Sequence, residues 1–434
     1  MAKPEKALGF WRTWSLSVGY MIGSGIFLMP TVLAPYGLLG ISSWLITGTG
    51  AMLLALVLAN LARRIPKVGG PYAYSRGAFG DFAGFLMGWC YWISLWTASA
   101  AIVVACVGYL GVFFPILGES FFVSTIAGLV ILALLVAINV AGVRQSGIFQ
   151  LVTTILKIIP LLAIGLIGLF YIEGSNIPPM NPSGEPPLAV MASAAILTMW
   201  AFVGLEAATV PAGDIIKPEK TIPRALVFGT LAVVLIYLLS SFTVMGLIDG
   251  STLAASQAPF ADAAVRIWGS WAGKAIAVGA VISTLGALNC SVLLAGQTPM
   301  AAAFDGLFPK VFGTMSKTGT PAFSLIVGGA LAGILMIMNY TKGFVGAFTF
   351  IILLSTLAVV IPYAFSAMAD LYFSLRDKTL SRARVMRDAV IAIVAFVFSI
   401  FLMVGSGQES VYYAFLLLMA GIPVYVFITR TTKK

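Results

Sequence analysis

Apolar stretches of about 20 residues recur along this chain, and they constrain its fold more than any other feature. A helix of about 20 residues spans the ~30 Å hydrocarbon core of a bilayer, so each stretch is a candidate transmembrane helix. Of the 434 residues, 60% are hydrophobic and only 9% are charged, which leaves too few polar side chains to cover a soluble protein of this size. We therefore predict an all-α integral membrane protein with a single transmembrane domain over residues 1–434.

The sequence divides into twelve expected spans. They lie at residues 14–36, 40–62, 83–115, 122–143, 149–172, 189–213, 225–247, 270–297, 322–340, 345–373, 388–407 and 411–429. Twelve crossings would place both ends of the chain on the same side of the membrane.

The basic residues in the loops and near the span ends are distributed unevenly. The side that would hold both termini carries 21 lysines and arginines, and the opposite side carries 3. By the positive-inside rule, we predict a multi-pass protein of the bacterial inner (plasma) membrane with both termini cytoplasmic. This arrangement accounts for the net charge of +10 without a nucleic-acid partner and indicates contact with anionic membrane lipid. Five tryptophans near expected span ends are predicted to be interfacial anchors: Trp89, Trp92, Trp96, Trp268 and Trp271.

The sequence lacks the features that usually mark several functional classes of protein. The chain has no histidine, and its three cysteines, Cys90, Cys106 and Cys290, all lie in apolar stretches, so we expect no metal site and no disulfide. No Walker-type loop indicates an ATPase, and no cluster of carboxylates indicates an enzyme, so we expect no catalytic residue and no cofactor. A channel would need a continuous polar stripe and a receptor would need a soluble output domain, and neither is apparent.

Two spans contain residues that weaken a helix near its middle. The first span holds "GYMIGSGIFLMP" at residues 19–30, and the sixth holds "WAFVGLEAATVPAG" at residues 200–213, including Pro211 and Gly213. Each begins a unit of five spans, so the chain reads as two repeats, at about 14–172 and about 189–373, followed by two further helices at about 388–429. Five crossings reverse the direction of the chain, so the second repeat would be inverted.

A broken span implies a ligand site. Where a helix unwinds inside a bilayer, its free N–H and C=O groups must line a cavity. The N–H groups of Gly23, Ser24 and Gly25 would begin a half-helix and suit a carboxylate, while free carbonyls suit an ammonium, so together they predict a site for an α-amino acid. The alternative is that the glycines only allow close helix packing. The second break, beside Glu206, favours the site.

Four motifs resemble those of the amino acid–polyamine–organocation transporter superfamily. They are the first-span motif, "VGGPYAYSRGAFG" after the second span, "WAFVGLEAATVPAGDIIKPEKTIPRA" around the sixth, and "LLAGQTPMAAAFDGLFPKVF" after the eighth. The resemblance covers about the whole chain and is closest to the branch of basic amino acid and polyamine antiporters, which includes exchangers of arginine for agmatine. It implies twelve helices in two inverted five-helix repeats with broken helices 1 and 6, plus two C-terminal helices. It also implies an amino acid or amine as the substrate, and a homodimer is the assembly found in similar antiporters.

The resemblance assigns roles to particular residues. The substrate carboxylate would meet the turn at Gly23, Ser24 and Gly25, and its α-amino group would meet carbonyls of Met21, Trp200 and Val203. Trp200 would also stack on the substrate and act as a middle gate, with Tyr91 as an outer gate and Tyr363 as an inner gate. Glu206 would sense protons or hold a substrate cation. The remaining substrate-binding candidates are Ser99, Ser291 and Ser355.

Three positions depart from the antiporter pattern. Ser99 replaces an asparagine that helps hold a guanidinium, and Ser291 replaces a tryptophan that cradles the aliphatic part of the substrate. Lys157 replaces a small apolar residue and resembles the lysine of proton-coupled amino acid transporters. Two functions therefore stay open: exchange of a cationic amino acid for its amine, and proton-coupled uptake or exchange of neutral amino acids with Lys157 as the coupling residue.

Lys157 and Glu206 are ionisable residues deep within expected spans. Placing a charged side chain at the centre of a membrane-spanning helix costs roughly 2.5–3.5 kcal/mol. Lys157 either snorkels to the cytoplasmic interface or donates to free carbonyls and links the broken first span to the eighth. Glu206 is either a structural hydrogen-bond acceptor in the sixth span or a carboxylate that pairs with a substrate ammonium or carries a proton.

Overall fold

The computed structural model describes residues 8–65, 69–142, 147–209, 215–339 and 343–432. Within these ranges the chain is helical, and its only β-type pairing is an isolated parallel bridge between Leu8 and Ile215. Nine described helical segments are long and apolar enough to cross a membrane, and two shorter apolar helices accompany them. The predicted all-α membrane class is therefore confirmed.

The helices follow the expected spans from one end of the chain to the other. In the first half they are α1 (Phe10–Met21), α2 (Ser24–Leu33), α3 (Gly37–Arg64), α4 (Pro71–Phe79), α5 (Asp81–Leu110), α6 (Ile116–Glu119), α7 (Phe121–Val140) and α8 (Gly147–Ile167). In the second half they are α9 (Pro187–Trp200), α10 (Pro218–Leu247), α11 (Gly250–Ala255), α12 (Pro259–Trp268), α13 (Ser270–Phe304), α14 (Ala322–Met338), α15 (Gly343–Arg376), α16 (Arg382–Gly405) and α17 (Gln408–Thr432).

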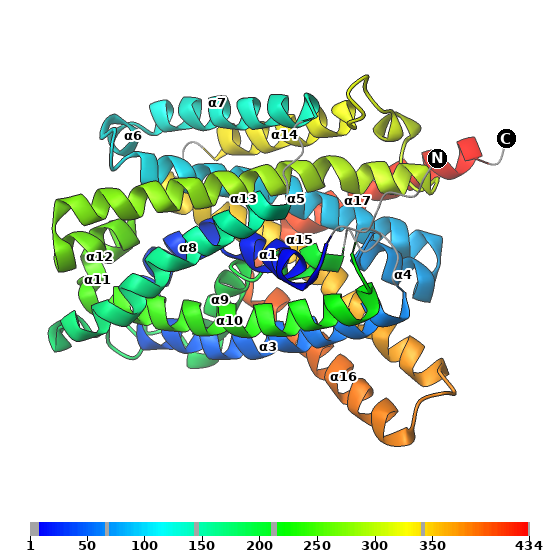
Figure 1. The fold of residues 1–434 in the computed structure, drawn as a ribbon, viewed down its shortest axis with the longest axis horizontal. Helices are drawn as coiled ribbons and strands as arrows, with labels where there is room; N and C mark the ends of the chain where they lie inside the picture. The colour runs from blue at the N-terminus through cyan, green and yellow to red at the C-terminus, as the bar shows by residue number, and fades with distance from the viewer. Residues whose placement is uncertain (1–7, 66–68, 143–146, 210–214, 340–342, 433–434) are drawn as a thin grey trace.

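The longest helices lie roughly parallel, with α5, α13 and α15 at the centre (Figure 1). Around them α3 pairs with α10 on one side and α7 with α14 on the other. The short helix α4 and the C-terminal end of α17 lie at one end of the bundle, and α6, α11 and α12 lie at the opposite end. The most apolar window of α5 is 94% buried and that of α17 only 17%, so α5 is a core helix and α17 a peripheral one.

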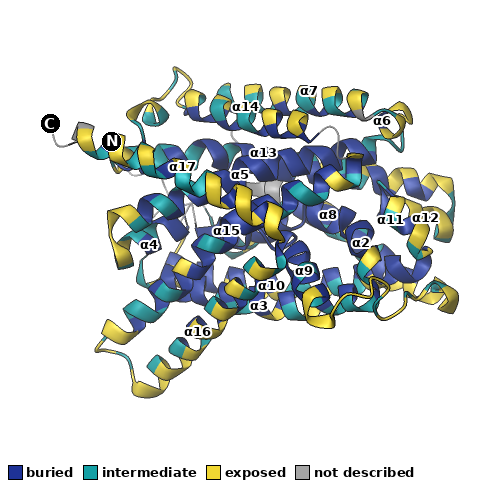
Figure 2. Cartoon of the chain, turned by 180° about the vertical axis from the view of Figure 1, so that it is seen from behind, coloured by how far each residue is buried: buried dark blue, intermediate teal, exposed yellow. Residues whose placement is uncertain are grey.

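The extent of burial distinguishes the helices at the centre of the bundle from those at its periphery. Exposed residues gather along α7, α16 and α17, while α5 is almost wholly buried and α13 and α15 are buried over a little more than half of their most apolar windows (Figure 2). Two of the five tryptophans predicted as interfacial anchors do not follow that prediction. Trp92 and Trp96 are buried, and Trp92 Nε1 donates to the Ala295 carbonyl of α13 at 3.1 Å. They lie on α5, the helix most enclosed by others, so they pack against protein.

The exact number of membrane crossings stays a prediction. The segment Phe10–Arg64 meets the criteria for one membrane-spanning candidate but contains two interruptions, at Ile22–Gly23 and at the 3-10 turn Ala34–Tyr36. The two helices in the expected sixth and ninth spans, α9 and α14, are too short to count as full crossings by length alone. Twelve crossings, two inverted repeats and the single domain that they form therefore remain expectations.

Candidate substrate site

The first span is broken where the sequence predicts it. Helix α1 ends at Met21 and α2 begins at Ser24, with Gly23 at φ −129° and ψ −136° between them. In a continuous helix the Gly23 N–H would donate to the Gly19 carbonyl, but here it donates to the Met21 carbonyl at 2.9 Å. The break thus frees the Gly19 carbonyl and places the first N–H groups of α2 at the turn.

The sixth span is broken as well. Helix α9 ends at Trp200, a turn follows through Gly204, and the 3-10 helix η4 covers Leu205–Thr209. Gly204 has φ +105°, a conformation that residues with a side chain rarely adopt. Pro211 and Gly213, the other helix breakers in this span, lie outside the described residues.

The two breaks pack directly against each other. A Cβ added to Gly25 would lie 2.7 Å from the Cα of Ala201, so glycine is what allows α2 to approach the end of α9. A hydroxyl of α1, Ser17 Oγ, donates to the Leu205 carbonyl of η4 at 3.2 Å. Tyr20 lies over Gly204 so closely that a Cβ there would be 2.1 Å from its ring.

A small cavity lies at this junction, with a volume of about 20 Å³. That is room for about one water molecule and less than an amino acid needs. Six of the predicted substrate-binding residues line it: Met21, Gly23, Ser24, Gly25, Trp200 and Val203. The four remaining lining residues are Tyr20, Ala98, Ile102 and Ala287, which the sequence did not single out.

Most carbonyls freed at the first break already have donors. The Met21 carbonyl accepts from Tyr237 Oη at 2.6 Å and from the Gly23 N–H, which fills both of its lone pairs. The Ile22 carbonyl accepts from Ser283 Oγ of α13 at 3.1 Å. A substrate ammonium at Met21 would have to displace Tyr237. By contrast, the Ser24 hydroxyl and the Trp200 indole N–H are buried and have no hydrogen-bond partner among the described residues.

The two serines that differ from the antiporter pattern, Ser99 and Ser291, form a hydrogen bond with each other. Ser99 Oγ of α5 donates to Ser291 Oγ of α13 at 3.0 Å, and Ser291 Oγ lies 2.9 Å from the Leu95 carbonyl. Ser355 of α15 donates to the Ser94 carbonyl at 2.8 Å. None of the three predicted serines lines the cavity, which is bordered on this side by apolar groups.

Lys157 lies inside the bundle. It is 1% exposed, and its Nζ donates to the freed Gly19 carbonyl at 3.0 Å. Gly286 of α13 lies opposite, where an added Cβ would be 3.3 Å from Nζ. The ammonium therefore sits between α1, α8 and α13, unlike a lysine that snorkels to an interface.

Glu206 is fully buried at the second break. Its Oε2 accepts from the Gly204 N–H at 3.2 Å and from the Tyr363 hydroxyl of α15 in a short hydrogen bond. Tyr91 lies near enough to interact electrostatically with Glu206, although neither Tyr91 Oη nor Glu206 Oε1 makes a hydrogen bond of ordinary geometry among the described residues. Both predicted gate tyrosines thus gather around this carboxylate.

Sequence reasoning missed two residues that donate to carbonyls of the first break, Tyr237 and Ser283, and also missed Tyr20, whose ring packs against Gly204 at the second break. A buried tyrosine or serine within an apolar span is an ordinary packing residue in most helices, so the sequence carries no signal of their role. The only available pointer was that each carbonyl freed by a break must find a donor.

Comparison with known proteins agrees with this geometry. A family model described as amino acid permease matches residues 8–428. The chain belongs to the amino acid permease family. This confirms the resemblance to the amino acid–polyamine–organocation superfamily, and the helices make the chain a multi-pass membrane protein.

Similar permeases include antiporters of basic amino acids and polyamines. The putative arginine/ornithine antiporter of Bacillus subtilis (strain 168) is 31% identical over 470 residues, covering 99% of this chain and 98% of that protein. The putrescine transporter PotE of Haemophilus influenzae is 29% identical, covering 99% and 98%. The cadaverine/lysine antiporter of Escherichia coli (strain K12) is 32% identical, covering 84% and 83%. This permease is therefore an amino acid or amine transporter of the antiporter branch, not a member of an enzyme family.

Proposed function

We propose that this permease exchanges a cationic amino acid for an amine, in the manner of arginine and agmatine or of the polyamines. The observation that carries the proposal is the meeting of two broken helices around one cavity, with a buried carboxylate at the second break. The names of the similar antiporters support the same substrate class.

The first break supplies the carboxylate end of the site. The N–H groups of the first turn of α2 have no helical acceptor and carry the positive end of the helix dipole. The buried Ser24 hydroxyl, without a partner among the described residues, is a further donor at the same turn. A substrate carboxylate would satisfy these groups.

Glu206 supplies the acceptor for a cation. Its Oε1 is buried and makes no hydrogen bond of ordinary geometry among the described residues, with Tyr91 nearby, while Oε2 is held by two donors. A buried carboxylate oxygen without a partner is costly, so it favours either a proton or a substrate ammonium or guanidinium. Exchange of one for the other would couple cation binding to proton release.

Liposome exchange tests the proposed function. Purified protein is reconstituted into vesicles loaded with arginine, agmatine, putrescine or alanine, and uptake of labelled substrate is measured with and without a pH gradient. We expect loaded arginine, agmatine or putrescine to stimulate uptake. Wild-type protein that binds alanine or serine but none of the cationic compounds would exclude this proposal.

The substitution Glu206→Gln tests the role of the carboxylate. A hydrogen bond to a charged group contributes about 1.5–3 kcal/mol, so we expect affinity for arginine or a polyamine to fall roughly 10- to 150-fold. Affinity is measured by calorimetry on purified protein at pH 5.5 and 7.5. The control is Glu119→Gln, at an exposed carboxylate, which should leave affinity unchanged. A change of only a few-fold in Glu206→Gln would favour a neutral substrate.

A second candidate is proton-coupled uptake or exchange of neutral amino acids. The cavity is bordered by Ala98, Ile102 and Ala287, and Ser99 and Ser291 bond to each other, so this side suits a small apolar side chain. Lys157 would then be the coupling residue, through its bond to the Gly19 carbonyl. The same liposome assay separates the candidates, because alanine would be the substrate that responds to the pH gradient.

We also propose that the chain lies in a bacterial inner membrane with its termini in the cytoplasm. The support is the uneven distribution of basic residues. In this orientation α4, the C-terminal end of α17 and the loop between α15 and α16 face the cytoplasm.

A further inference from the structure

A row of buried polar side chains runs along one face of α15, from the substrate site toward the predicted cytoplasmic end of the helix. Its four members lie three or four residues apart and are fully buried: Tyr363, Ser366, Asp370 and Ser374. We call these four residues the polar row. It begins at the Tyr363 hydroxyl, which donates to Glu206 at the second break, and it extends roughly 16 Å at 1.5 Å per residue.

Three oxygens of the polar row have no hydrogen-bond partner among the described residues. They are Ser366 Oγ, Asp370 Oδ1 and Ser374 Oγ. A hydroxyl inside a helix commonly donates to the carbonyl four residues earlier. Thr356 on the same helix donates in this way to Ile352 at 2.7 Å, and Ser399 of α16 donates to Ala395 at 2.9 Å. The oxygens of the polar row are therefore left for other polar partners.

The spacing of the polar row suits hydrogen bonds bridged by water. Side chains three or four residues apart on a helix are about 5–6 Å apart, which is about the length of two hydrogen bonds in series. A water between neighbouring members would satisfy the oxygens without partners, because a buried water commonly makes about three hydrogen bonds to such groups. Hydroxyl groups both donate and accept, so a chain of this composition can pass a proton along its length.

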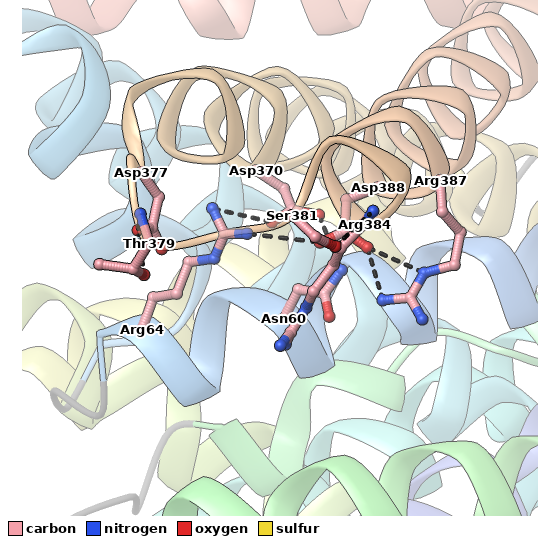
Figure 3. A network of polar contacts seen from close by, with 9 residues as sticks. All are labelled: Asn60, Arg64, Asp370, Asp377, Thr379, Ser381, Arg384, Arg387 and Asp388. Atoms are coloured by element: carbon pink, nitrogen blue, oxygen red, sulfur yellow. Dashed lines mark hydrogen bonds and ion pairs between the residues drawn. The ribbon is translucent and has the colours of Figure 1, made fainter.

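The far end of the polar row reaches the surface through charged partners (Figure 3). Asp370 Oδ2 accepts from Asn60 at 3.2 Å, and Asp370 Oδ1 lies 4.0 Å from Nη1 of Arg64. The Arg64 side chain is 18% exposed and lies 3.4 Å from Asp388, which also accepts from the exposed Arg387 at 2.8 Å. Solvent that reaches Arg64 is therefore one side chain away from Asp370.

Other helices that pack against α15 have their charges engaged elsewhere. Helix α9 has no charged residue, and Asp81, the charged residue of α5, pairs with Arg76 of α4 at 2.8 Å. The charged residues of α17 lie in its first and last turns: Glu409 and Arg430. Asp377, just beyond the end of α15, accepts hydrogen bonds from Thr379 in the following loop. The charges beside Asp370 therefore come from α3 and α16.

We propose that the polar row is the route by which protons pass between Glu206 and the cytoplasm, with Ser366 and Ser374 as relay residues. When Glu206 takes up a proton, the Tyr363 hydroxyl gives its proton to Glu206 Oε2 and receives one from a water that bridges it to Ser366. Release is the reverse. Each hydroxyl gives one proton and receives one, so no group of the row is left changed. The inference rests on the proposed exchange of a proton for a substrate cation at Glu206.

The test is the rate of proton release when substrate binds to the purified full chain. Arginine is mixed rapidly with the protein in weakly buffered detergent solution, a pH indicator dye follows the released protons, and calorimetry gives the affinity. We expect Ser366→Ala to bind arginine and to release as many protons as the wild type. Release should be at least about tenfold slower, because the chain has lost one hydroxyl that transfers protons. Glu206→Gln should release none.

The matched control is Ser399→Ala, at another fully buried serine, whose hydroxyl is bonded within its own helix. It should release protons at the wild-type rate, whereas Ser374→Ala, at the far end of the polar row, should be slow like Ser366→Ala. Wild-type rates in both row variants, equal slowing in the control, or a loss of affinity without a change in rate would each overturn the route and leave the role of Glu206 intact. A wild type that binds arginine without releasing protons would overturn both the route and coupling by Glu206.

Discussion

Lys157 and Glu206 each contact the backbone at a different break. Lys157 donates to the Gly19 carbonyl in the last turn of α1, and Glu206 accepts from the Gly204 N–H after α9. Each ionisable group replaces a hydrogen bond that the interrupted helix has lost. A change in the protonation of either group would therefore alter how firmly its broken helix is held, which is what coupling to protons requires.

The substitution Lys157→Met removes the ammonium but keeps a long side chain. Because a hydrogen bond from a charged group contributes about 1.5–3 kcal/mol, we expect proton-linked transport to fall at least about tenfold while the protein still expresses. Transport is measured in liposomes between pH 5 and pH 8. The control is Lys274→Met, at an exposed lysine of α13. Normal transport by Lys157→Met at every pH would remove lysine from the coupling mechanism.

Residue types and the family resemblance together indicated much of the candidate site, and Trp200 and Val203 came from the resemblance. Gly23, Ser24, Gly25, Trp200 and Val203 line the cavity, and the backbone chemistry of a broken helix was enough to single out the first three. The hydrogen bond between Ser99 and Ser291 could not be predicted, because it depends on how α5 rotates against α13. The hydrogen bond from the Tyr237 hydroxyl to the Met21 carbonyl could not be predicted either, because it depends on the packing of α10 against α1.

At the scale of elements, the half-helices are positioned by close backbone contact. The approach of α2 to the end of α9 has no room for a side chain at Gly25. The breaks themselves were predictable from glycine and proline, because these residues weaken a helix wherever they occur. Their mutual contact was not, because the sequence gives no distance between α2 and α9.

The substitution Gly25→Ala should separate the two half-helices. Its Cβ would lie 2.7 Å from Ala201 Cα and 3.0 Å from Ala201 Cβ, and overpacking of this kind costs about 1–3 kcal/mol. We expect substrate affinity to fall about 5- to 150-fold, measured by calorimetry. Gly174→Ala, at a loop glycine with open space around it, is the control. Unchanged affinity in Gly25→Ala would show that the half-helices do not meet so closely when substrate binds.

A second set of contacts between elements lies near the C-terminal end of α15. Asp370 is held by Asn60 and Arg64, which lie one turn apart on α3 (Figure 3). Tyr363, the partner of Glu206, lies two turns earlier on the same helix, so this contact fixes the segment that carries the predicted inner gate.

The substitution Asp370→Asn should loosen α15 against α3. It replaces one carboxylate oxygen with an amide N–H₂ that would face the donor of Asn60 or of Arg64, so we expect a loss of about 1–3 kcal/mol of stability, seen as a lower unfolding temperature. Glu219→Gln, at an exposed residue of α10, is the control and should unfold like the wild type. An unfolding temperature unchanged in Asp370→Asn would mean that the contacts of Asp370 with Asn60 and Arg64 contribute nothing to holding α15.

At the scale of the whole molecule, the apolar pattern predicted an all-α membrane protein but did not determine how many times the chain crosses the membrane. Helices occur at all twelve expected spans, yet α9 and α14 are short, and interruptions divide the Phe10–Arg64 segment. Length and hydropathy therefore cannot count crossings where helices are broken. Orientation depends on the charges of the loops, which can be tested directly.

Cysteine labelling in intact cells tests the topology. Lys217 and Arg384 lie in segments predicted to be cytoplasmic, and Glu409, at the start of α17, lies on the opposite side. All three positions are exposed, whereas native Cys90 and Cys106 are buried and Cys290 is half-buried, so the wild type provides the background. A membrane-impermeant thiol reagent should label Glu409→Cys and should label Lys217→Cys and Arg384→Cys only after the membrane is permeabilised. Because 21 basic residues in loops and near span ends are assigned to one side and 3 to the other, an inverted chain would violate the positive-inside rule almost completely. Labelling of Lys217→Cys and Arg384→Cys in sealed cells, with Glu409→Cys protected, would reverse the orientation and place the loop between α15 and α16 outside the cell.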